Sequence, residues 1–342
     1  MRYLLLAVMA ALPALTGHDW LERRAYLMGT TLRIRVAATD RTVATEAIER
    51  AFSEVARLED LLSTWRHDTE LSRLNAASPG DPVSLSQDVS DALHETRGWS
   101  IRTERAFDPA VGALIDAWDL RGSDGAVVPT AAAIDSALAA SGFRHFRVDS
   151  ATGTGTRLHP DAWLDAGAFG KGLALRAARK ALEDEGIAAA LLDFGGQIMV
   201  LGPAPLDESW VISVADPERR QAPVLLLGLQ PGQSAATTSI SERRAEVEGH
   251  EVGHVLDPRT GRPVPGWGSV TVVADDPLVA DVLSTALFVM GPERALEWAG
   301  QYPEVGVVVV RSATGLPQWS RSLDGAVVGD SPTQSNRRST IE

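Results

Sequence analysis

Residues 165–196 read DAGAFGKGLALRAARKALEDEGIAAALLDFGG and carry the strongest structural signal in the chain. Apolar residues recur every three or four positions over 172–185, which predicts a helix with one buried face. The apolar run at 187–193 follows directly and predicts a buried strand, which the pair Gly195-Gly196 ends. A helix that leads straight into a buried strand indicates a domain of mixed α and β structure.

The start of this stretch, 165–172, is also a candidate anion site. Small residues surround Lys171 just before the predicted helix begins. Free backbone amides and the helix dipole favour a negative group at a helix N-terminus, and an ammonium adds to that preference. Small residues also let a helix pack closely against a sheet, so close packing explains these glycines equally well.

The remaining pattern favours an α+β fold. Several strands are expected to follow one another without a helix between them, which is untypical of a doubly wound parallel sheet. We therefore expect mixed sheets with flanking helices. The predicted helices cover 43–62, 130–142, 277–289 and 292–300, and the predicted strands cover 32–36, 210–215, 223–229, 252–256, 268–274 and 305–311.

Composition limits the class of protein. The chain has 342 residues, 44% of them hydrophobic, a net charge of −13 and no cysteine. The negative charge argues against a nucleic-acid partner, and the lack of cysteine excludes disulfides, thiol catalysis and zinc–thiolate sites.

The two ends of the chain differ from its middle. Residues 1–17 place Arg2 before a short apolar run, which predicts a signal peptide and an exported, periplasmic protein, or one on the periplasmic face of the inner membrane. A buried N-terminal segment is the alternative. A chain without cysteine is not expected to be a lipoprotein. We expect the folded domain over 18–328 and a disordered polar tail over 329–342.

A second candidate site lies far downstream, in a predicted helix. Asp281 and Thr285 are four residues apart, so both lie on one helical face. A carboxylate and a hydroxyl are hard oxygen ligands, and Mg²⁺ commonly takes one carboxylate together with substrate phosphates. The alternative is structural: Asp281 can interact with the helix N-terminus, and Thr285 can bond to its own helix carbonyls.

Two further side chains are candidates. His254 precedes a dense turn that contains Asp257 and Arg259, where a histidine can act as a general base or simply hold the turn. Trp65 follows a predicted helix in a polar loop, where an indole can stack on a flavin or adenine ring or cover the edge of a core.

The sequence contains no Gly-x-Ser-x-Gly elbow, Walker motif or Rossmann fingerprint, which argues against serine hydrolases, P-loop NTPases and dinucleotide dehydrogenases. Its ordered segments instead resemble the ApbE-type FAD:protein FMN transferase family. The segments that carry the resemblance are Met28-Gly29-Thr30, 61–75, 106–112, 165–172 with its helix and strand, 254–263, and 280–291.

The resemblance implies a bilobal α+β fold with FAD in the crevice between the lobes. It also implies a catalytic base, His254. The residues that it implies to contact FAD are Met28, Trp65, Ala106, Phe107, Asp108, Asp165, Lys171 and Val255. The implied Mg²⁺ ligands are the Ala168 carbonyl, Asp281 and Thr285.

The implied reaction is a Mg²⁺-dependent phosphoryl transfer from FAD. A Ser or Thr hydroxyl of an acceptor flavoprotein, expected to be a membrane-associated or periplasmic redox protein, attacks the FMN-side phosphorus and AMP leaves. Arg259 and Arg262 are further candidates for stabilising the transition state. With water as the nucleophile, the same site gives a Mg²⁺-dependent FAD pyrophosphatase, and a non-catalytic FAD-binding protein is the third alternative.

Three positions depart from the family pattern. Ile240 stands where a glycine is usual after Thr238-Ser239, and Gly253 replaces an aromatic residue common near the histidine. Isoleucine does not enter left-handed backbone space as glycine does, so the loop at Ile240 is expected to take another path. Trp65 replaces the tyrosine of many transferases, and an aromatic residue at this position favours transfer over hydrolysis.

Overall fold

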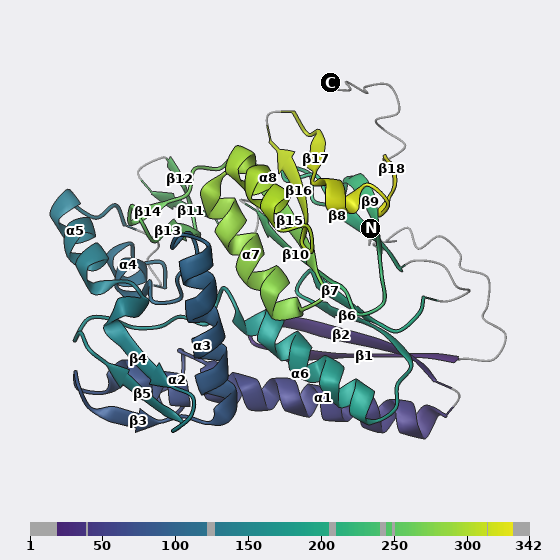
Figure 1. Cartoon of the computed structure of the whole chain (residues 1–342), viewed down its shortest axis with the longest axis horizontal. Helices are drawn as coiled ribbons and strands as arrows, with labels where there is room; N and C mark the ends of the chain where they lie inside the picture. Colours follow the sequence, from purple (N-terminus) through teal and green to yellow (C-terminus); the bar gives the residue numbers. More distant parts are fainter. Residues whose placement is uncertain are drawn as a thin grey trace, which may run out of the picture.

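The computed structural model describes residues 19–38, 40–121, 127–204, 210–239, 244–247, 250–312 and 314–330. Its centre is an 8-stranded sheet in which every neighbouring pair of strands is antiparallel (Figure 1). In sheet order the strands are β1 (Asp19–Leu27), β2 (Thr30–Ala38), β6 (Ala189–Phe194), β7 (Gln197–Leu201), β10 (Ser234–Ser239), β15 (Gly268–Ala274), β16 (Gly306–Arg311) and β17 (Pro317–Trp319).

Both faces of this sheet are covered. Neighbouring residues of β15 show this, because Val272 belongs to the main core and Val273 to a second apolar cluster, and successive strand residues point to opposite faces. The main core lies under the helices α1 (Arg41–Leu62), α6 (Gly170–Asp184), α7 (Pro277–Met290) and α8 (Pro292–Gln301). The second cluster lies under a 3-stranded sheet of β8 (Trp210–Ala215), β9 (Pro223–Leu229) and β18 (Val327–Asp330).

A second group of elements lies to the left of α7 in Figure 1. Its residues Leu71, Val89 and Phe146 belong to the same main core as the central sheet, so one continuous core joins the two groups. The group contains α2 (Glu70–Ala76), α3 (Gln87–Arg102), α4 (Gly112–Ala117), α5 (Ala131–Ala140) and a sheet of β3 (Pro82–Ser84), β5 (Thr154–Arg157) and β4 (Phe146–Asp149). Two short hairpins complete it, β11 (Arg244–Val247) with β12 (His250–Gly253) and β13 (Leu256–Asp257) with β14 (Arg262–Pro263).

The predicted α+β class is confirmed, and most predicted elements lie within a few residues of those observed. The helix predicted over 172–185 begins at Gly170, two residues early. The single strand predicted over 252–256 was wrong, because the chain there divides between β12 and β13, which pair with different partners. Gly329 and Asp330, expected in a disordered tail, end β18, and residues 331–342 and the predicted signal peptide lie outside the described residues.

Among the described residues, no helix combines the length and the apolar character that spanning a membrane requires.

Candidate functional site

The starts of helices α6 and α7 meet at Asp281. Asp281 is buried, with 4% of the residue exposed, and Oδ2 of its carboxylate accepts a hydrogen bond of 2.8 Å from the Gly172 amide. Its Oδ1 lies 3.6 Å from Nζ of Lys171. The N-cap residue of α6 makes no side-chain capping bond, so a carboxylate from α7 binds an amide of the first turn of α6. The structure thus brings Lys171 and Asp281, predicted from separate motifs, into one site.

Gly172 permits this meeting of the two helices. A Cβ atom at Gly172 would lie 2.4 Å from the Pro277 carbonyl oxygen, 2.7 Å from Cα of Leu278 and 2.8 Å from Cβ of Asp281. Backbone atoms of α7 therefore occupy the space that any side chain would need. Gly172 therefore serves close packing here, and that packing also positions the Asp281 carboxylate.

Replacing Gly172 by alanine should therefore destabilise the protein. Overpacking of this kind costs about 1–3 kcal/mol, because the neighbouring backbone must move. We expect a lower urea midpoint for Gly172→Ala. Gly98→Ala is the matched control, since a Cβ at Gly98 in α3 meets nothing within 4 Å and alanine favours a helix. Equal midpoints for Gly172→Ala and the wild-type protein would contradict the packing argument.

The residues around Asp281 fit the Mg²⁺ site implied by the resemblance. Thr285 lies one helical turn after Asp281 and is half-buried. Within the described residues the Ala168 carbonyl, just before α6, accepts no hydrogen bond. A carboxylate, a hydroxyl and a carbonyl are all oxygen donors that Mg²⁺ accepts. No cluster of three or more His, Cys, Asp or Glu side chains suited to a metal occurs in the described part of the chain.

Met28 lies beside the start of α6. It forms a two-residue hairpin turn with Gly29 between β1 and β2, and both residues have positive φ, 48° and 76°. This is the pattern of a type I′ turn, which matches the twist of the paired strands. A Cβ at Gly170 would lie 3.5 Å from Cε of Met28, so the turn contacts the first residue of α6.

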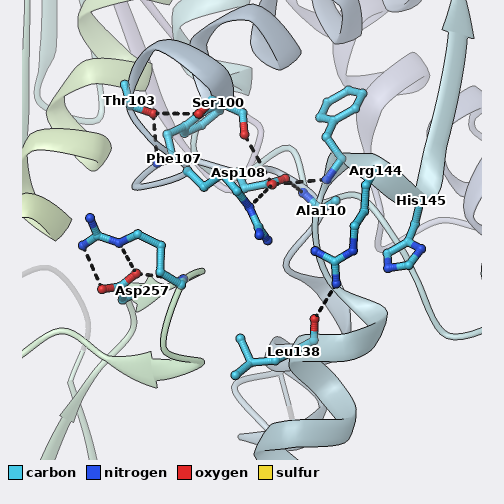
Figure 2. Close-up of polar contacts among 12 residues, drawn as sticks. Ser100, Thr103, Phe107, Asp108, Ala110, Leu138, Arg144, His145 and Asp257 are labelled. Carbon is cyan, nitrogen blue, oxygen red and sulfur yellow. Dashed lines mark hydrogen bonds and ion pairs between the residues drawn. The ribbon is translucent and has the colours of Figure 1, made fainter.

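The segment Ala106–Asp108 presents its side chains to the protein interior. Ala106 and Phe107 are buried, and the Asp108 carboxylate accepts hydrogen bonds from the amides of Ala110 and Phe143 and from the Ser100 hydroxyl (Figure 2). Burial raises the pKa of the Asp108 carboxyl, and the two amide hydrogen bonds oppose that rise. Ala106 and Phe107 each expose 1% of their surface and Asp108 exposes 5%, so little of this segment is accessible to a ligand.

Asp165 and Trp65 are brought together by Arg121. The Arg121 guanidinium forms an ion pair with Asp165 and lies over the Trp65 ring, with Cζ 4.6 Å from the ring centroid. The other oxygen of Asp165 accepts a hydrogen bond of 2.9 Å from the Gly167 amide, within the loop that leads to Lys171.

Sequence reasoning missed Arg121 and its second aromatic contact, Trp163. Arg121 follows a short helix and Trp163 lies two residues before Asp165, and neither position has a distinctive local pattern. A cavity of about 760 Å³ adjoins this cluster, lined by Thr64, Arg121, Trp163 and residues of α2, α4 and α5. Lys171 and Asp281 do not line this cavity.

His254 and Val255 lie in a turn that packs on α4 and on the C-terminal half of α7. Both residues are half-buried, and the Val255 carbonyl accepts a hydrogen bond of 2.8 Å from the Val264 amide. Nε1 of Trp118 donates to the Gly261 carbonyl at 2.8 Å, and Nε1 of Trp267 donates to the Phe288 carbonyl at 3.0 Å. The turn is therefore held at several points.

Arg259 is engaged within this turn. Its Nε and Nη2 atoms each donate a hydrogen bond of 2.9 Å to Asp257 (Figure 2), and these bonds raise the pKa of the Arg259 guanidinium. Nη2 also approaches the Val289 carbonyl at 3.5 Å. Val289 lies two turns beyond Asp281, roughly 12 Å along the helix axis. The structure thus gives Arg259 a role in holding the turn, and provides no support for a direct role at Asp281.

The loop that departs from the family pattern begins behind α7. Oγ1 of Thr238 lies 2.9 Å from Oγ of Ser284, which donates a hydrogen bond of 2.9 Å to the Asp281 carbonyl. Thr238 and Ser239 end β10, and both are buried. The path predicted to differ at Ile240 lies outside the described residues.

Comparison with known proteins identifies the family of the chain. The ApbE family model matches residues 28–309. A FAD:protein FMN transferase of Vibrio cholerae is 30% identical over 332 residues, which are 93% of this chain and 96% of that protein. One of Klebsiella pneumoniae is 31% identical over 288 residues, which are 84% of this chain and 87% of that protein.

Solved structures show the same likeness. The crystal structure of the ApbE protein of Thermotoga maritima has a TM-score of 0.81 and 27% identity, covering 89% of this chain and 98% of that one. The flavin transferase ApbE of Vibrio cholerae has a TM-score of 0.77 and 26% identity, covering 90% of this chain and 99% of that one. With a family model that matches most of its length and relatives of this similarity, the chain belongs to the ApbE family.

Proposed function

We propose that this protein is a Mg²⁺-dependent FAD:protein FMN transferase. The observation that carries the proposal is the junction of α6 and α7, where Lys171, the Gly172 amide and the Asp281 carboxylate meet. An ammonium and a helix start favour the pyrophosphate of FAD, and a buried carboxylate favours a divalent cation beside it. The relatives named as FAD:protein FMN transferases support the same activity.

In this proposal the protein groups divide the work of binding the diphosphate. Asp281, Thr285 and the Ala168 carbonyl would hold Mg²⁺, which supplies neutralising charge when bound. Lys171, with 33% of its side chain exposed, would contact a phosphate oxygen while it stays beside Asp281. Met28 and Val255, both half-buried, would border the dinucleotide, and the buried segment Ala106–Asp108 would support that border.

His254 would take the proton from the acceptor hydroxyl. The hydroxyl oxygen of an acceptor Ser or Thr forms a bond to the FMN-side phosphorus, and the bond between that phosphorus and the bridging oxygen breaks. AMP leaves and carries the bridging oxygen, and FMN stays on the acceptor as a phosphoester.

The acceptor and the location are part of the proposal. The apolar run near the N-terminus supports export to the periplasm, where a membrane-associated or periplasmic redox protein would be modified. The net charge of −13 suits an acceptor domain that is neutral or basic.

Intact mass tests the proposal. The purified protein is incubated with FAD, Mg²⁺ and a candidate acceptor domain. The intact mass of the acceptor is then measured by mass spectrometry. A gain of one FMN phosphoester, lost when a chelator is present, is the expected result. An unmodified acceptor together with free FMN and AMP would instead indicate a FAD pyrophosphatase. If FAD stayed intact with every candidate acceptor and also without an acceptor, the result would indicate a FAD-binding protein.

A further inference from the structure

We propose that Arg121 is a positioning residue that holds Trp65 as a stacking platform for one planar ring of the dinucleotide, an inference that rests on the proposed function. Arg121 contacts two tryptophans at once. Its Cζ lies over the rings of Trp65 and Trp163, 4.6 Å from each centroid. A planar guanidinium stacks on aromatic faces in a way that the ammonium of lysine does not reproduce.

Hydrogen bonds fix the plane of this guanidinium. Nη2 of Arg121 donates to the Thr64 hydroxyl at 2.7 Å and pairs with Oδ1 of Asp165, and Nη1 approaches the Thr64 carbonyl at 3.4 Å. Only 25% of the Arg121 side chain and 20% of the Asp165 side chain are exposed. The ion pair is therefore partly shielded from water, and the contacts orient Arg121 beneath the residue next to Thr64.

Trp163 supports the Arg121 guanidinium from the side of α4. Its Nε1 donates a hydrogen bond of 2.7 Å to Asp116 of α4. A Cβ atom at Gly112 would lie 2.0 Å from Cδ2 of Trp163, so the indole rests directly on the first residue of α4. Contacts thus run without a break from Gly112 through Trp163 and Arg121 to Trp65.

Trp65 is the end of this series and faces solvent. Its exposed fraction is 70%, and no other aromatic ring of the described residues stacks on it. An exposed indole that is backed on one side by a fixed cation offers its remaining surface to a planar ring. Asp165, which holds Arg121, begins the loop that reaches Lys171 six residues later. One short loop therefore joins Asp165, the partner of Arg121, to the proposed pyrophosphate site.

Loss of the Arg121 guanidinium behind Trp65 should weaken the binding of only one ring of FAD. The full purified chain is titrated calorimetrically with FAD, FMN and ADP, as the wild type and as Arg121→Gln, Arg121→Lys and Trp65→Ala. We expect each variant to bind FAD about tenfold more weakly, on the scale of one base stacked on an aromatic side chain. Only one of FMN and ADP should lose affinity, and which one does so identifies the ring. The KM for FAD should rise while kcat changes little.

Controls separate a platform from a general loss of structure. Arg102→Gln removes a similar contact, because Cζ of Arg102 lies 4.7 Å from the Trp99 centroid at the end of α3, and it should leave the affinity for FAD unchanged. Arg121→Lys keeps the charge beside Asp165, so that variant is expected to fold. The double variant Arg121→Gln with Trp65→Ala should lose no more affinity for FAD than Trp65→Ala alone.

The outcomes are distinguishable. Unchanged affinity in the Arg121 variants, additive losses in the double variant, or equal losses for FMN and ADP would each overturn the platform while leaving the transferase proposal intact. A wild-type protein that binds no FAD would overturn the proposed function and the platform together.

Discussion

Asp281→Asn should lower the rate of FMN transfer by at least about 100-fold, the scale lost when one group that stabilises developing charge is removed. An asparagine oxygen can still accept the hydrogen bond from the Gly172 amide, so the meeting of α6 and α7 survives. The substitution does remove the negative charge beside Lys171. The expected defect is therefore in cation binding rather than in folding, and FMN transfer measured against Mg²⁺ concentration should show half-maximal activity at a higher concentration.

The matched control lies at the start of the same helix. Asp276 is the N-cap of α7, accepts a hydrogen bond of 2.8 Å from the Leu278 amide and pairs with Arg176. Asparagine is also a good N-cap, so Asp276→Asn should keep wild-type activity within a few-fold. If Asp281→Asn transferred FMN at the wild-type rate at every Mg²⁺ concentration, the metal assignment would be wrong.

Local signals allowed the elements around the site to be predicted. The helix–strand stretch at 165–196 matches α6 and β6 within two residues at each end, because apolar periodicity records which face of an element is buried. The strand predicted over 252–256 failed because the chain there divides between β12 and β13. That division depends on two different partner strands, which the local pattern does not reveal.

The contacts that build the site could not be derived from spacing. Gly172 and Asp281 are 109 residues apart, and no periodicity connects them. Resemblance to a family placed both motifs in one site, and the structure then showed why a glycine is needed between the helices. Arg121 lay beyond both approaches. It belongs to none of the family segments, and its partners Thr64 and Asp165 are 57 and 44 residues away.

His254→Gln should reduce the rate of transfer by about 100- to 10,000-fold, the range for loss of a general acid or base. Glutamine keeps a polar side chain of similar size, and the bonds of the neighbouring turn at Val255 and Gly261 are made by main-chain atoms. The affinity for FAD, measured by calorimetry, should therefore change little while kcat falls.

Because a base acts on whichever nucleophile attacks, FAD hydrolysis without an acceptor should decline together with transfer in the His254→Gln variant. His94→Gln, at an exposed position of α3, is the matched control and should behave as the wild type. A variant that kept kcat but lost affinity for FAD would show that His254 binds the dinucleotide instead. Equal losses of kcat in His254→Gln and His94→Gln would show that the loss in His254→Gln does not report on proton transfer. Removing the His254 imidazole leaves the Lys171–Asp281 junction in place. If His254 is the base, its replacement should therefore lower kcat and leave the affinity for FAD unchanged.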